Sequence, residues 1–79
     1  MSAAQTMAIW MFYMLSLLKR RLGLTWDEFD GIRREYGLST FLLEHYELLH
    51  YYDNDYVVDD TLRYIREQGG DVLELQRVG

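Results

Sequence analysis

Apolar residues recur along this chain at the three- and four-residue spacing of helices that bury one side, and glycines divide the chain into helix-length segments. The first segment, 3–22, holds an apolar run over 8–18 that only Ser16 interrupts, followed by three basic residues. Basic residues complement the negative end of a helix, and Gly23 can take the left-handed conformation that ends one. We therefore predict a helix over 3–22 that is buried along its apolar run.

The second predicted helix has the clearest signals. Thr25, followed three residues later by Glu28, forms a capping box, and Gly37 is placed to end the helix. Gly31 lies inside it and costs about 1 kcal/mol relative to alanine, which implies either close packing or a bend at this position. The side expected to pack against the rest of the protein consists of Phe29, Ile32, Arg33 and Tyr36.

The remaining pattern predicts two further helices. Ser39 is placed to cap a third helix that runs to about Tyr51, and residues 53–55 form the turn and cap before a fourth helix that continues to Gln68. The expected apolar face of the third helix consists of Phe41, Leu42, His45, Leu48, Leu49 and Tyr52. The expected buried stripe of the fourth consists of Val58, Leu62 and Ile65.

These elements predict an all-α fold, a compact bundle of about four helices with a short extended C-terminal tail. Residues 7–70 are expected to form a single helical domain. Residues 1–6 are expected to be a flexible leader, because Met7 would make an equally good start. Residues 71–79 begin with an alternation of polar and apolar residues, and we expect an extended tail or a short strand there.

Composition excludes several classes of protein. A chain of 79 residues without cysteine cannot be a small disulfide-stabilised secreted domain, and it points to the reducing cytoplasm. The net charge of −5 opposes binding to nucleic acid, since the only basic clusters are at 19–21 and 33–34. The apolar run over 8–18 is much shorter than the roughly 20 residues that a membrane-spanning helix needs. We therefore predict neither a nucleic-acid partner nor a membrane.

Residues 36–39 resemble the turn of a helix-turn-helix, in which the second helix enters the major groove of DNA. The exposed positions of that second helix include Thr40, Glu44 and Glu47, with no arginine, lysine, asparagine or glutamine to contact base edges or phosphates. DNA binding is therefore not favoured. A small regulatory domain, homodimeric or similar to a helix-turn-helix, is the first alternative function.

Groups that could bind metal or act in catalysis do not form a recognised pattern. His45 and His50 are five residues apart, which does not align them on one helical face, and we expect His45 to be a hydrogen-bonded core histidine. The aspartates within 53–60 lack the glycine and the closing glutamate of a calcium loop. We predict no catalytic, cofactor-binding or metal-binding residue and no enzymatic activity. A carboxylate or metal-dependent enzyme is the least favoured alternative.

Acidic and tyrosine residues gather in the segment 35–62, which has seven carboxylates and no lysine or arginine. Tyrosine supplies rigid, amphipathic contact area of the kind enriched in protein interfaces. We therefore predict a non-catalytic module that binds another protein, with self-association into a homo-oligomer left open. The predicted contact residues are Tyr46, Glu47, His50, Tyr51 and Asp55.

From about residue 9 to residue 70 the chain also resembles a family of small bacterial proteins that is classified as a domain of unknown function. The matching residues are Gly23-Leu24, Tyr36-Gly37, Phe41-Leu42, Glu44-His45-Tyr46, Leu48-Leu49-His50, Tyr56-Val57-Val58-Asp59-Asp60 and Gly69-Gly70. The chain departs from the family at Tyr51-Tyr52, where Thr-Gln is more usual. The resemblance implies a compact, mainly helical fold. Members are often encoded beside a protein that looks like an ADP-ribosyltransferase, which implies a neutralising, antitoxin-like role toward that partner.

Overall fold

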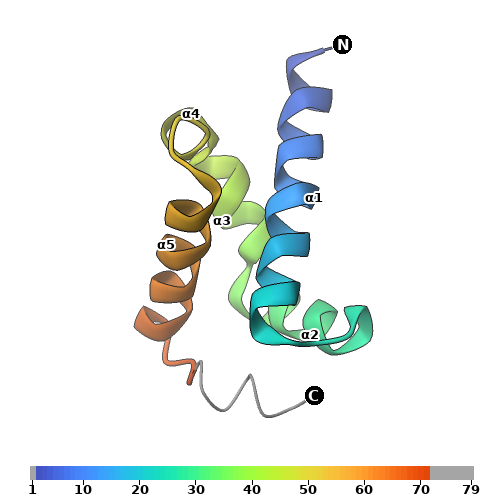
Figure 1. Cartoon of the computed structure of the whole chain (residues 1–79), viewed down its shortest axis with the longest axis vertical. Coiled ribbons are helices and arrows are strands. Elements are labelled where there is room, and N and C mark those ends of the chain that lie inside the picture. The colour runs from blue at the N-terminus through green and yellow to red at the C-terminus, as the bar shows by residue number, and fades with distance from the viewer. Residues whose placement is uncertain (1, 72–79) are drawn as a thin grey trace.

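Five helices make up most of residues 2–71, which are the residues described by the structure, a computed structural model (Figure 1). They are α1 (Ala3–Leu22), α2 (Trp26–Tyr36), α3 (Leu38–Glu44), α4 (Tyr46–Leu49) and α5 (Asn54–Glu67). Residues 2–71 contain no strand, and the predicted all-α class is confirmed. The tail predicted over 71–79 lies, apart from Asp71, outside the described residues.

The bundle is built around α3, which contacts both α1 and α2, while α1 also packs against α5. Figure 1 shows α1 and α5 on opposite sides, with α2 across the lower end of α1 and α4 at the upper end of α5. This arrangement places the start of α5 and the short helix α4 beside each other at one end of the molecule. The surface at that end carries most of the predicted contact residues.

One hydrophobic core joins the helices. Among its fully buried side chains are Leu18 of α1, Phe29 of α2, Leu42 of α3 and Ile65 of α5. The predicted stripe of α5 is confirmed, since Val58, Leu62 and Ile65 are all buried. Thr61 is the one buried polar residue among those described, and its hydroxyl donates a hydrogen bond of 2.8 Å to the carbonyl of Val57. That bond lets a hydroxyl lie in the core without an unsatisfied donor.

Helix α1 has the predicted bounds but only one buried side. Ser2 caps it, accepting from the backbone N–H of Gln5 at 3.1 Å, so residues 3–6, which the sequence predicts as part of a leader, lie in its first turns. The prediction that the run over 8–18 is buried is wrong along one face, where Ile9, Phe12 and Tyr13 are 57%, 64% and 51% exposed. The reason is that α1 lies at the edge of the bundle, where α3 and α5 cover only part of its circumference.

Helix α2 matches its prediction closely. Thr25 and Glu28 form the capping box, and Gly37 ends the helix in the left-handed conformation with φ 61°. A side chain added at Gly31 would meet nothing within 4 Å, and the helix continues through this residue. Close packing therefore does not account for the glycine. Gly37 alone separates α2 from α3. This one-residue connection is shorter than the three- or four-residue turn of a helix-turn-helix.

The prediction of one helix from Ser39 to Tyr51 is wrong, because the chain forms α3 and α4 with a break at His45. Ser39 does not cap α3, which begins directly after Gly37, and its hydroxyl instead lies 3.3 Å from a guanidinium nitrogen of Arg33. At His45 the backbone leaves the helical range, with φ −104° and ψ 10°. The N–H groups of Leu48 and Leu49 both donate to the carbonyl of His45, so a new series of helical hydrogen bonds begins at this residue.

The break changes which side chains are buried. Phe41, Leu42 and Leu49 of the predicted face belong to the core, but Leu48 is 60% exposed and Tyr52 is 45% exposed. His45 is exposed as well, so the prediction of a core histidine is wrong, although the predicted hydrogen bond is present. Apolar and aromatic side chains that a continuous helix would direct inward therefore reach the surface around α4.

Candidate protein-binding surface

The short helix α4 is anchored to the bundle through Tyr46. Its ring lies edge-on to the ring of Trp10 in α1, with centroids 5.2 Å apart and planes at 81°. Edge-to-face pairs of this kind stabilise a contact by about 0.5–1.5 kcal/mol beyond the area that they bury. Trp10 and Tyr46 are both partly buried, so this pair closes one side of the core and leaves ring edges at the surface.

His50 extends the aromatic contacts outward. Its ring stacks on Tyr46 at 4.3 Å with an interplanar angle of 5°, and it contacts the ring of Tyr51 at 4.1 Å. Its Nδ1 lies 2.5 Å from the backbone carbonyl oxygen of Tyr46. A carbonyl oxygen only accepts, so Nδ1 carries the proton in this bond, and Nε2 is then the acceptor in the neutral imidazole. The ring is thus held in one orientation by two contacts with the same residue.

We call Trp10, Tyr46, His50 and Tyr51 the aromatic ladder. It begins in the bundle and ends at Tyr51, which is 81% exposed, the highest value among the large hydrophobic side chains. Three of the five predicted contact residues, Tyr46, His50 and Tyr51, are therefore brought together. A fourth, Glu47, lies on α4 with an exposed side chain.

Asp55, the fifth predicted contact residue, belongs to a different feature. It lies in the first turn of α5, where carboxylates interact favourably with the positive end of the helix. Its side chain lines an open groove of about 450 Å³ between α1 and α5, together with Leu17, Arg20, Arg21, Asn54 and Val58. Arg21 also forms an ion pair of 3.2 Å with Asp59 across this groove. The structure therefore places Asp55 among basic side chains, away from the ladder.

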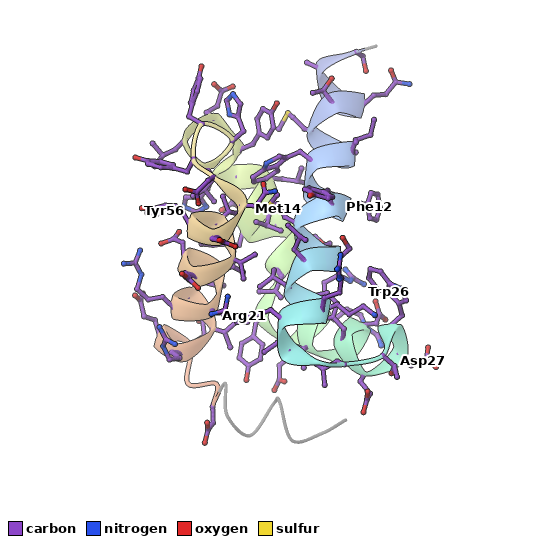
Figure 2. All side chains as sticks on the ribbon, in the orientation of Figure 1. Phe12, Met14, Arg21, Trp26, Asp27 and Tyr56 are labelled. Atoms are coloured by element: carbon purple, nitrogen blue, oxygen red, sulfur yellow. The ribbon has the colours of Figure 1, made fainter. Side chains whose placement is uncertain are left out.

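Sequence reasoning missed two parts of this surface. Trp10 lies in an apolar run, where nothing in the pattern distinguishes it from core residues, and its pairing with Tyr46 depends on how α1 meets α4. Tyr52 and Tyr56 stack at 4.3 Å and 21°, joining the turn before α5 to its first turn. Figure 2 shows Tyr56 on the outer side of α5, away from α1. The four-residue spacing of this pair was the available signal.

The charge around the ladder is negative. Glu44, Glu47 and Asp53 are exposed, and the segment 35–62 contains no lysine or arginine to offset them. The intrahelical ion pairs lie elsewhere, between Asp30 and Arg33 on α2 and between Asp60 and Arg63 on α5. The hydrogen bond from Arg33 holds the pKa of Asp30 below its usual value, with a smaller contribution from the charges of Arg33 and Arg34 against the opposing effect of burial. The carboxylates near the aromatic ladder therefore have no lysine or arginine within the segment 35–62 to neutralise them.

Within residues 2–71 no three histidine, aspartate or glutamate side chains gather as a metal site requires. His45 and His50 each use Nδ1 for a hydrogen bond to the carbonyl four residues earlier, at 2.8 and 2.5 Å. None of the described helices combines the length and apolar character needed to cross a bilayer. Comparison of the chain with protein-family models, curated proteins and solved structures gave no match. The resemblance to the small bacterial family therefore stays a prediction.

Proposed function

We propose that this protein is a non-catalytic module that binds another protein through the aromatic ladder. The observation that supports this proposal most directly is the exposure of Tyr51, at 81%, on a ring stack that is anchored in the bundle. A tyrosine side chain has only two side-chain torsions, so it loses little conformational entropy on binding. Glu47, on the same short helix, would supply a charged contact at the rim.

The proposed partner carries a basic surface. Exposed carboxylates, Glu44, Glu47 and Asp53, flank the ladder along the chain, and opposite charges across an interface accelerate association and select among partners. The sequence resemblance suggests an ADP-ribosyltransferase-like protein, whose activity this module would neutralise in the cytoplasm by covering a basic substrate-binding cleft. Asp55 would take part only where the partner extends to the α1–α5 groove, because Arg20 and Arg21 lie beside it.

The experiment that tests the proposal uses the tagged chain, immobilised at low density, to capture proteins from its native host, including any ADP-ribosyltransferase-like neighbour. The captured protein is then titrated in solution with the native chain, Tyr51→Ala and Trp26→Ala. Trp26 is a matched control, since it is 56% exposed but lies on α2. We expect Tyr51→Ala to weaken binding by about 30-fold, as loss of an interface hot spot does, and Trp26→Ala to leave it unchanged.

Salt concentration gives a second readout. Raising sodium chloride from about 50 mM to about 500 mM is expected to slow association, because the Debye length shortens below the separation at which charges steer an encounter. Unchanged affinity of Tyr51→Ala would exclude the ladder as the binding surface. Association that does not depend on salt would exclude the basic character of the partner.

A further inference from the structure

A second exposed aromatic surface lies on the other side of α1 from α5. Figure 2 shows Phe12 on α1 and Trp26 at the start of α2 both pointing to this side, away from Tyr56 on α5. Phe12 is 64% exposed, Trp26 is 56% exposed and Ile9, one turn before Phe12, is 57% exposed. We call these three residues the α1–α2 face. None of them belongs to the aromatic ladder.

A groove of about 430 Å³ opens directly beside Phe12, between α1 and α2. Its floor consists of buried apolar side chains, Met11, Leu15 and Phe29, and the exposed rings of Phe12 and Trp26 form its rim. Arg33 lies at the groove with its guanidinium held by Asp30, at 2.7 Å. The surface thus combines a projecting aromatic side chain and an apolar hollow next to each other.

We propose that a second copy of this chain covers the α1–α2 face, forming a two-fold symmetric dimer in which Phe12 of each copy enters the groove of the other. A two-fold interface is self-complementary, so each copy must offer both the projection and the hollow on one patch. Phe12 and its adjacent groove meet this requirement. The dimer does not depend on the protein-binding role of the ladder, which lies on another surface.

The charges of α1 do not oppose pairing of this helix with its own copy. Residues 3–22 contain no carboxylate, and their only charges are the basic residues at 19–21. In an antiparallel pair centred on Phe12, the position opposite Lys19 is Gln5, and the position opposite Ser16 is Ala8. The ammonium of Lys19 is already held 5.2 Å above the ring of Trp26. The pairing therefore opposes no like charges along α1, although each chain carries a net charge of −5.

The area of the α1–α2 face can be compared with the area that a stable interface buries. At their exposed fractions of 57%, 64% and 56%, the side chains of Ile9, Phe12 and Trp26 together expose roughly 350 Å². A stable interface buries about 800 Å² on each partner, so the three side chains supply a little under half of it and the groove and flanking polar residues the rest. An interface at the lower end of the range is expected to dissociate on dilution.

Analytical ultracentrifugation of the whole chain, from about 5 μM to about 500 μM, tests this proposal. The native protein is expected to shift with concentration from its monomer mass of 9.5 kDa to twice that value. Phe12→Glu is expected to stay monomeric. Its thermal unfolding curve at low protein concentration, where the native chain is also monomeric, should match the native curve because the side chain is mostly exposed. Tyr51→Glu, at the end of the ladder, is the control and is expected to dimerise like the native chain.

Disulfide cross-linking tests the register. The chain has no cysteine, so Ala8→Cys combined with Ser16→Cys is expected to give a covalent dimer on mild oxidation. Neither single variant is expected to do so, because each cysteine would face its own copy across about 12 Å, beyond disulfide reach. A native chain that stays monomeric at every concentration, or a Phe12→Glu variant that dimerises, would overturn the proposal. Cross-linking of the single variants instead of the double variant would overturn the antiparallel register.

Discussion

The ring of His50 lies 4.3 Å from the ring of Tyr46, with planes 5° apart, while its Nδ1 is hydrogen bonded to the backbone carbonyl of the same tyrosine. One histidine therefore holds both the side chain and the main chain of the residue four positions before it. A four-residue helix such as α4 cannot be stable by itself, because too few hydrogen bonds form to offset the ordering of the chain. These contacts, with Trp10 behind them, keep α4 in place.

Replacing His50 by alanine is expected to destabilise the protein by about 1–2 kcal/mol, the sum of a modest hydrogen bond and an aromatic pair. Urea unfolding measures the difference in free energy. Amide hydrogen exchange should at the same time become faster at residues 46–51, while α1 and α5 keep their protection. Equal loss of protection in all helices would contradict a local role for His50.

Two glycines should respond to alanine in opposite ways. A Cβ at Gly70 would lie 2.6 Å from the Cγ2 of Ile65 and 2.8 Å from the hydroxyl of Tyr36, whereas a Cβ at Gly31 would meet nothing within 4 Å. We expect Gly70→Ala to lower the unfolding free energy by about 1–3 kcal/mol through overpacking. Gly31→Ala should raise it by up to about 1 kcal/mol, because alanine is the better helix former. Thermal unfolding of both variants tests the pair.

Alanine substitutions at Leu18 and Ile9 test how much each side of α1 contributes to stability. Leu18 is fully buried and Ile9 is 57% exposed. Leu18→Ala is expected to cost about 2–5 kcal/mol, as removal of buried methyl groups does. Ile9→Ala should change the stability of the dilute protein by less than about 0.5 kcal/mol. Denaturant midpoints measured at low protein concentration distinguish these outcomes, and a large loss in Ile9→Ala would show that this face is buried in the folded chain.

Asp30 should make a small part of the stability depend on pH. The hydrogen bond from Arg33 lowers the pKa of Asp30 in the folded protein below its ordinary value of 3.8. The resulting stabilisation is present above pH 3.8 and is lost as the pH falls through the lowered folded value. Asp30→Asn is therefore expected to be less stable than the native chain at neutral pH, with the difference closing in acid. The effect should be small, because the side chain is 46% exposed.

Arg33→Gln provides the matched change for Asp30. The double variant with Asp30→Asn should be more stable than the sum of the two single losses predicts, and the deviation from additivity measures the coupling between the two side chains. Additive losses would mean that the ion pair does not stabilise the fold. Unfolding free energies at neutral pH and in acid supply all the values that this comparison needs.

Local signals explain which parts of the structure the sequence could predict. The capping box of Thr25 and Glu28 and the helix ends at Gly23 and Gly37 depend on a few adjacent residues, and all are present. The break at His45 depends on how competing donors share the carbonyls of Phe41 and His45, which periodicity does not express. A continuous apolar run likewise hides which side of a helix packs inward.

The candidate surface shows the same division. Tyr46, His50 and Tyr51 could be proposed from their residue types and their spacing. The tertiary contact between Trp10 and Tyr46, which joins residues far apart in the chain, could not. Asp55 belongs to the same acidic, tyrosine-rich segment, but the structure places it at the start of α5, where it lines the α1–α5 groove.

The single-residue connections at Gly37 and His45 also bear on how the chain folds. They make α2, α3 and α4 neighbours in sequence as well as in space, and helical domains dominated by such local contacts fold in about microseconds to milliseconds. The pairing of α1 with α5 is different, since Tyr13 and Asn54 that meet there are separated by 41 positions. Closing this long loop is expected to limit the folding rate, so substitutions between α1 and α5 should slow refolding more than those within the α2–α4 segment.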